Sequence, residues 1–148
     1  MAETPRLIRP LKPLEPLVGR WETVIRWSEE TRRLVGGPVE LKGEARFTPG
    51  EGGRFLHYQF GPSHWIIGRD DPSLEYTVLY SDDREISRVY RMTLSRGVWK
   101  IWRDSATFHQ RFEAGLLRDG KRIKAYWDRS VDGKKWIHDF DIKYSKIG

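Results

Sequence analysis

The sequence predicts an all-β fold, a single closed antiparallel up-and-down β-barrel of about ten strands. Apolar and polar residues alternate with a period of two from residue 19 to residue 145, which is typical of strands buried on one face. Short turn-forming clusters divide this region at intervals of about 8–12 residues, as expected for strands joined by hairpins. A meander with one apolar face must cover that face and its edges. A closed barrel is therefore favoured over a two-sheet sandwich, which usually needs long crossovers.

The 148 residues fit one domain preceded by a short arm. Residues 1–13 contain three prolines, and we expect them to form an extended arm. Residues 14–148 are assigned to the barrel, which begins with a short turn around Leu14, Leu17 and Val18.

The first two strands alternate most clearly. Between residues 19 and 27, Trp21, Ile25 and Trp27 share one face, opposite charged residues; residues 39–47 follow the same pattern. Residues 28–38 fit either a single helical turn or an extended hairpin. The remaining strands are predicted at 54–60, 64–69, 75–81, 86–95, 97–103, 106–114, 121–130 and 135–145.

The segments between these strands have turn chemistry. Asp119-Gly120 and Asp132-Gly133 are the strongest signals, because Asp-Gly readily adopts the positive φ angles of tight hairpin turns. The other connections are short clusters of Gly, Pro, Ser and Asp, which favour turns for the same local reasons.

Charge and hydropathy argue against two classes of partner. The net charge is +6, but the basic residues are interleaved with acidic ones, as in Arg20-Trp21-Glu22. Nucleic-acid binding needs basic residues gathered on one face, so no nucleic-acid partner is expected. No apolar run is long enough for a membrane-spanning helix, and no membrane span is expected.

Missing residue types narrow the function further. The sequence has no Cys, which excludes disulfides, thiolate metal sites and cysteine nucleophiles. It has no Asn and therefore no N-glycosylation site, and we expect a cytoplasmic bacterial protein. Arg outnumbers Lys by 18 to 9. This composition is typical either of a thermophilic protein or of a GC-rich genome.

Neither hydrolytic nor metal-dependent chemistry is indicated. The carboxylates on the clear strands, Asp139 and Asp141 among them, fall on polar faces, and no G-x-S-x-G motif is present. The histidines His57, His64 and His109 show no metal-binding spacing, so no metal site is predicted, and no catalytic residue is assigned.

Four polar residues are predicted on the inner face of the barrel. Arg88 and Tyr90 alternate with outward residues, so that an inward guanidinium and phenol are placed to hold an anion. The alternative for Arg88 is a position at the barrel mouth, with its head group in water. Gln110 lies between two phenylalanines, and His138 lies on the predicted face of Trp136, Phe140 and Ile142. Trp27 and Trp127 are expected to offer stacking surfaces to a flat ligand.

Several motifs resemble those of lipocalin-like (calycin) barrels. The segment LEPLVGRW at residues 14–21 is similar to their L-x-x-L-x-G-x-W start. The segments GEGGRFLHYQF, GPSHWIIGRDD, VYRM and WIHDFDIKY resemble an uncharacterised bacterial family of such barrels. Nitrobindins and fatty-acid-binding proteins are related in architecture. The resemblance implies a barrel with an internal cavity, and by analogy with nitrobindins it makes His138 a candidate axial haem ligand. Asp139 and Asp141, which flank His138, depart from the apolar nitrobindin pattern.

These observations favour a protein that binds a small hydrophobic molecule, either neutral or anionic, in the barrel cavity, with no cofactor. The alternatives are a haem-binding nitrobindin-like protein, and a barrel enzyme of the isomerase or cyclase type. A binder needs one or two polar anchors, whereas an enzyme needs an inward acid and base, and no inward carboxylate is predicted. A barrel with a filled core is a further alternative. The sequence leaves open whether the chain is a monomer or a homodimer.

Overall fold

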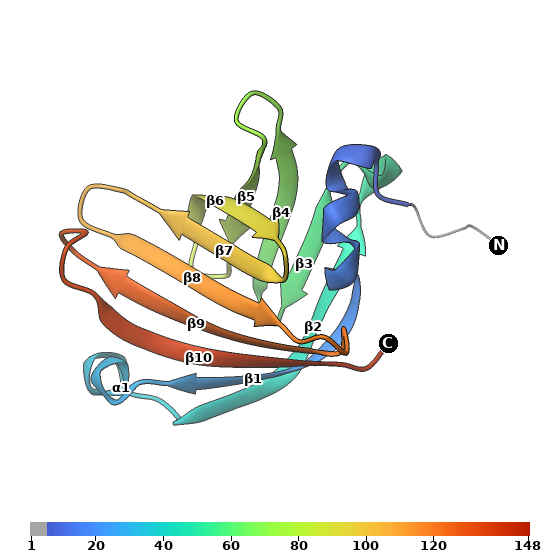
Figure 1. Cartoon of the computed structure of the whole chain (residues 1–148). Helices are drawn as coiled ribbons and strands as arrows, with labels where there is room; N and C mark the ends of the chain where they lie inside the picture. Colours follow the sequence, from blue (N-terminus) through green and yellow to red (C-terminus); the bar gives the residue numbers. More distant parts are fainter. Residues whose placement is uncertain (1–5) are drawn as a thin grey trace.

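A computed structural model describes residues 6–148 and confirms the closed ten-stranded antiparallel barrel (Figure 1). Each strand pairs with its neighbours in sequence, and β1 also pairs with β10 to close the sheet. The strands are β1 (Gly19–Trp27), β2 (Glu40–Pro49), β3 (Leu56–Phe60), β4 (Ser63–Asp70), β5 (Glu75–Ser81), β6 (Ser87–Ser95), β7 (Val98–Arg103), β8 (His109–Leu116), β9 (Arg122–Ser130) and β10 (Ile137–Lys146).

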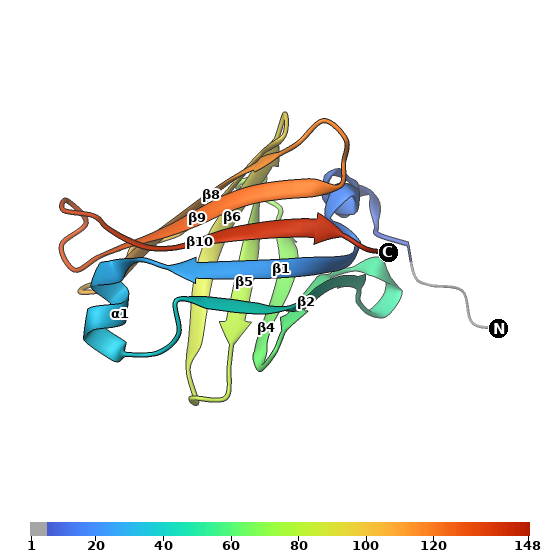
Figure 2. The same cartoon turned by 90° about the horizontal axis from the view of Figure 1, so that it is seen from below.

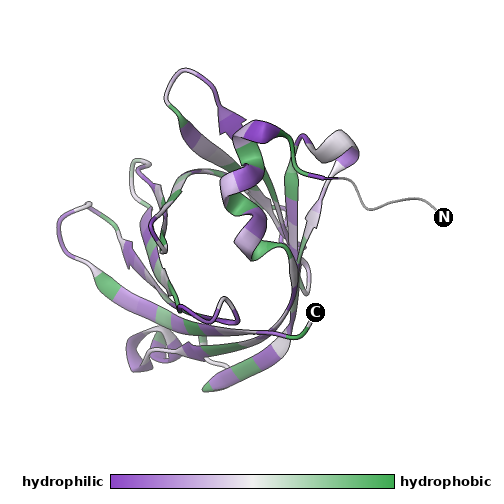
Figure 3. Cartoon of the chain, turned by 45° about the vertical axis from the view of Figure 1, so that its right-hand side comes forward, coloured by the Kyte–Doolittle hydropathy of each residue, from purple (hydrophilic) through white to green (hydrophobic). Residues whose placement is uncertain are grey.

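The period-two pattern places the core inside the barrel, and Figure 3 shows the resulting alternation of apolar and polar positions along the strands. On β1, Trp21 and Thr23 are buried, whereas Arg20 and Glu22 on the other face form part of the barrel exterior. Trp99 on β7 is fully buried and contacts Phe47 and Phe112 edge-on. Aromatic side chains therefore fill the half of the barrel that lies nearer Trp21.

A 3₁₀ helix, η1 (Arg9–Leu17), closes that end of the barrel. Its residues Leu11, Leu14 and Leu17 are fully buried, and the indole Nε1 of Trp21 donates a hydrogen bond to the Leu17 carbonyl oxygen at 2.8 Å. This part of the predicted arm is thus helical rather than extended. Prolines fit such a helix because their fixed φ is compatible with it. Residues 1–5 of the predicted arm lie outside the described residues.

The ambiguous segment 28–38 contains one short helix, α1 (Glu29–Val35). The Ser28 hydroxyl accepts a hydrogen bond from the Thr31 amide and caps its first turn. Gly36 and Gly37, with φ of 69° and 106°, allow the chain to turn back toward β2. Figure 2 shows α1 and η1 at opposite ends of the barrel. No helix in residues 6–148 has the length and hydropathy needed to span a membrane.

One irregularity in β10 changes which side chains face inward. His138 pairs with Asp128 and Phe140 pairs with Trp127, so Asp139 is an extra residue between two adjacent pairs. Such a bulge reverses the alternation on one side of it. Phe140, Ile142 and Tyr144 face inward as predicted, but the predicted inward positions of Trp136 and His138 are wrong.

Candidate ligand-binding site

The barrel encloses a cavity of about 670 Å³ at the end opposite η1. This volume lies in the range of small-molecule sites, which are mostly apolar with a few polar anchors. The mouth of the cavity is the end of the barrel where β1, β5 and β7 finish and where β6 and β8 begin. Apolar side chains dominate the walls, including Ile25, Leu41, Phe60, Trp65, Val78 and Ile101.

Arg88 lines this cavity, which agrees with its predicted inward orientation. Its guanidinium carbon lies 4.6 Å from the ring centre of Phe108 and 5.9 Å from that of Tyr80. The two rings stabilise the cation through their π faces. No carboxylate forms an ion pair with Arg88 within residues 6–148. A delocalised cation is therefore exposed to the cavity without an anionic partner from these residues.

Tyr90 and Gln110 also line the cavity, and the sheet brings them together. The Tyr90 hydroxyl donates a short hydrogen bond to the Gln110 side-chain oxygen across the intervening strand β7. Burial raises the pKa of the Tyr90 phenol, and the nearby cations Arg88 and Arg103 oppose that effect. The phenol stays neutral and can donate or accept a hydrogen bond.

Arg103 lies beside Tyr90 on the lining of an adjacent hollow rather than of this cavity, and the sequence analysis did not select it. It pairs in register with Gln110, and its guanidinium carbon lies 5.7 Å from the ring centre of Tyr90. Its Nε atom is buried and has no hydrogen-bond partner. The alternation of Trp99, Ile101 and Arg103 on β7 is the signal that would have identified it.

Trp27 and Trp127 line the cavity, as predicted. The Trp27 ring contacts Phe140 with centroids 6.2 Å apart, and the Trp127 ring contacts Phe112 at 5.1 Å. Their remaining faces give the cavity flat aromatic walls. Such walls suit a planar or chain-like apolar ligand.

An inward carboxylate is present, which corrects the expectation that none exists. The bulge turns Asp139 into the cavity, where its Oδ1 accepts a 2.7 Å hydrogen bond from the Thr31 hydroxyl. Arg129 lies 3.6 Å from the same oxygen through its Nε, and its Nη2 donates to the Thr31 hydroxyl at 3.2 Å. The negative charge of Asp139 is thus balanced by Arg129, and its hydrogen bond to Thr31 attaches α1 to the barrel. The sequence gives no separate signal for it, because the preceding alternation places it outside.

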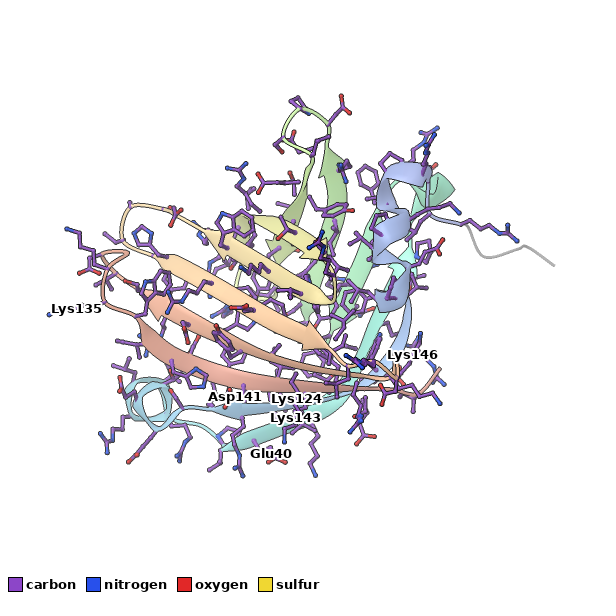
Figure 4. The ribbon with its side chains drawn as sticks, in the orientation of Figure 1. Glu40, Lys124, Lys135, Asp141, Lys143 and Lys146 are labelled. Atoms are coloured by element: carbon purple, nitrogen blue, oxygen red, sulfur yellow. The ribbon has the colours of Figure 1, made fainter. Side chains whose placement is uncertain are left out.

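His138 lies on the outer surface rather than in the cavity. Its Nδ1 is 3.1 Å from Asp128 and its Nε2 is 3.2 Å from Asp141, whose outer position on β10 is labelled in Figure 4. Trp136 also lies outside, beneath the guanidinium of Arg111 at 4.1 Å. His138 therefore does not fit the role of an axial ligand for haem inside the barrel.

The remaining histidines form no metal centre with other ligands. His57 and His64 stack on the outer face with ring nitrogens 3.1 Å apart, and His109 contacts Asp104. Within residues 6–148 no group of three or more His, Asp or Glu side chains is arranged to hold a metal ion.

The closed antiparallel barrel with a chamber open at one end defines the structural class of this protein. No protein-family model matches the sequence, and no curated protein matches it. The crystal structure of Rv2717c from M. tuberculosis is similar, with a TM-score of 0.57 and 13% sequence identity. The match covers 96% of this chain and 99% of that chain. At this identity the similarity shows a shared fold only.

Proposed function

We propose that this protein binds a small hydrophobic molecule with an anionic head group inside the barrel. The observation that carries the proposal is Arg88, a cavity-lining guanidinium with no carboxylate partner among the described residues. Tyr90 and Gln110 beside it supply polar anchors, and Trp27 and Trp127 supply apolar contact.

Arg88 differs from the other two arginines that line the cavity, because both of those form ion pairs with carboxylates. Arg84 forms an ion pair with Asp82 at 2.5 Å, and Arg129 is paired with Asp139. Removing a cation from water is costly unless an anion compensates. For Arg88, a ligand carboxylate would provide that compensation. The forked guanidinium matches the two oxygens of a carboxylate, and the low dielectric of the cavity strengthens the attraction.

The test is titration calorimetry with a fatty acid and its methyl ester on the wild type and on Arg88→Leu. We expect the wild type to prefer the acid, and the substitution to weaken acid binding by about 1.5–3 kcal/mol. Binding of the ester should be nearly unchanged, because it makes no charged contact. Arg91→Leu is the matched control. Arg91 lies on the outer face of the same strand and is ion-paired with Glu75, so its loss changes the net charge equally without altering the cavity.

Equal affinity of the wild type for acid and ester would contradict the proposal, and Arg88 would then be a mouth residue that faces water. The empty Arg88→Leu protein should be as stable as the wild type or more stable, because an uncompensated cation is removed. A thermal melt of both proteins checks that the loss of binding does not reflect unfolding.

A further inference from the structure

We propose that the head group of the ligand carries two negative charges and is held between Arg88 and Arg103. This inference rests on the proposed function and specifies its ligand class as a dianionic amphiphile. A phosphate monoester and a head bearing two carboxylates share this chemistry.

The first observation is the position of Arg103. As an inner-face residue at the end of β7, it lies between the strands that carry Tyr90 and Gln110. Its Nε is buried without a partner, and Asp104, which follows it in the chain, instead contacts His109. A buried donor that lacks a hydrogen bond is costly, so a ligand oxygen that drew the Arg103 side chain toward it would relieve a penalty already present in the empty protein.

The second observation is the charge around the mouth. Arg84, Arg88 and Arg129 line the cavity there, and Arg103 lies beside them over the ring of Tyr90, on the lining of an adjacent hollow. Asp82 pairs with Arg84, and Asp139 pairs with Arg129. Within residues 6–148 no carboxylate forms an ion pair with either of the other two. Two positive charges, Arg88 in the cavity and Arg103 beside Tyr90, therefore lack an ion-pair partner among the described residues, and a single carboxylate would neutralise only one of them.

The third observation is that the two cations lie over neighbouring aromatic rings. Arg103 lies over the ring of Tyr90 at 5.7 Å and Arg88 over the ring of Tyr80 at 5.9 Å, and the centres of these two rings are 6.3 Å apart. The phenol oxygen of Tyr90 is fixed by its hydrogen bond to Gln110. One anion beside this oxygen can thus reach both guanidinium groups, each of which offers several donors in a planar fork.

The apolar part of the ligand has one direction in which to extend. Below the arginines the cavity is lined by Trp65, Val78, Ile101 and Trp127, and η1 closes the far end. An amphiphile bound with its head at the mouth would bury its chain against these residues. This arrangement satisfies both the charge and the hydrophobic surface of the cavity.

The ligand test uses wild-type protein and four decyl compounds that differ only in the head: decyl phosphate, decyl sulfate, decylmalonate and decanol. All are kept below their micellar concentrations, and binding is followed by tryptophan fluorescence and calorimetry. Phosphate and sulfate heads are both tetrahedral but carry different charges at about pH 8, because the second pKa of a phosphate monoester is about 6. We expect decyl phosphate to bind at least about tenfold more tightly than decyl sulfate at this pH.

This preference should shrink at about pH 5.5, where the phosphate head carries close to one charge. If decylmalonate and decyl phosphate both bind tightly, the charge of the head group determines affinity. If one of them binds more tightly, the site also selects the shape of the head group.

Substitutions of Arg103 then test whether this residue binds the second negative charge of the head group. Arg103→Met should abolish the preference for phosphate over sulfate while sulfate binding persists through Arg88. Arg103→Lys keeps the charge, so it should retain part of the preference. Arg91→Met is the control for a change in net charge on the outer face and should leave the preference intact. Thermal melts confirm that each variant is folded.

The outcomes separate the two proposals. If decyl sulfate and decyl phosphate bind equally well, and both bind better than decanol, the dianion inference is wrong while the proposed function stands. If no anion binds better than decanol, the proposed function itself fails. A preference for phosphate that survives Arg103→Met would also overturn the assignment of Arg103.

Discussion

His138 is a protonation-sensitive residue on the outer face of the barrel. Burial alone would lower its pKa, but hydrogen bonds to Asp128 and Asp141 outweigh that effect, so its pKa is raised. Asp128 also accepts a hydrogen bond from Arg111 at 3.1 Å, and it links strands β8, β9 and β10 through these contacts. The charged form of His138 is thus favoured in the folded protein over the unfolded chain.

We predict that His138→Gln destabilises the protein more at acidic pH than at alkaline pH. A histidine with a raised pKa contributes stability that is fully present below its unfolded pKa of about 6.5 and is lost as the pH rises through the folded value. The measurement is the free energy of unfolding by urea, for wild type and variant, across this range. A difference between the two proteins that stays constant or grows with pH would contradict the assignment.

The inward positions of individual residues were predictable wherever the alternation of a strand is unbroken. Arg88, Tyr90 and Gln110 lie on regular strands and were correctly placed inside. His138 and Asp139 exchanged faces because the bulge inserts one residue, and a shift of one residue reverses a period of two. Nothing in the local sequence marks the bulge, since its position depends on pairing with β9 and on the contact of Asp139 with α1.

Among the elements, the two short helices have opposite roles at the two ends of the barrel. The leucines of η1 recur every three residues, which is the repeat of a 3₁₀ helix, and this spacing was the available signal that its prolines obscured. In α1, Leu34 and Val35 are largely exposed although they border the cavity. This helix is attached through Asp139, whose backbone carbonyl accepts from the Ser28 amide and whose carboxylate accepts from Thr31.

We predict that Leu14→Ala in η1 lowers the free energy of unfolding by about 2–5 kcal/mol, because it removes a fully buried side chain and leaves a cavity at the closed end. The matched control is Leu34→Ala in α1, where 72% of the residue is exposed. That change should alter stability by no more than about 0.5 kcal/mol. Equal effects of the two substitutions would show that η1 is not part of the folded core.

At the scale of the whole molecule, the outer face of the barrel carries many ion pairs between side chains of neighbouring strands. Cross-strand ion pairs include Arg20–Glu44, Arg91–Glu75 and Arg111–Asp128. Each exposed pair contributes little at room temperature. Their contribution rises with temperature, because the cost of removing charged groups from water falls as temperature increases.

We predict that the protein unfolds above the range of about 45–65 °C that is typical of mesophilic domains. The absence of Asn and Cys supports the same expectation, since it removes residues that are damaged by heat. Differential scanning calorimetry gives the midpoint directly. A midpoint within the mesophilic range would mean that the high Arg content reflects genome composition alone.

The closure of the barrel by η1 has a consequence for kinetics. Because η1 closes one end of the barrel, a ligand enters and leaves the cavity through the mouth at the other end. A bound ligand must therefore leave before another can bind. Replacement would then proceed at the rate of spontaneous departure, and raising the concentration of the incoming molecule would not accelerate it. Arginine side chains lie at this mouth. Their positive charge would increase the association rate of anionic ligands, and the increase would be larger at low ionic strength than at high ionic strength.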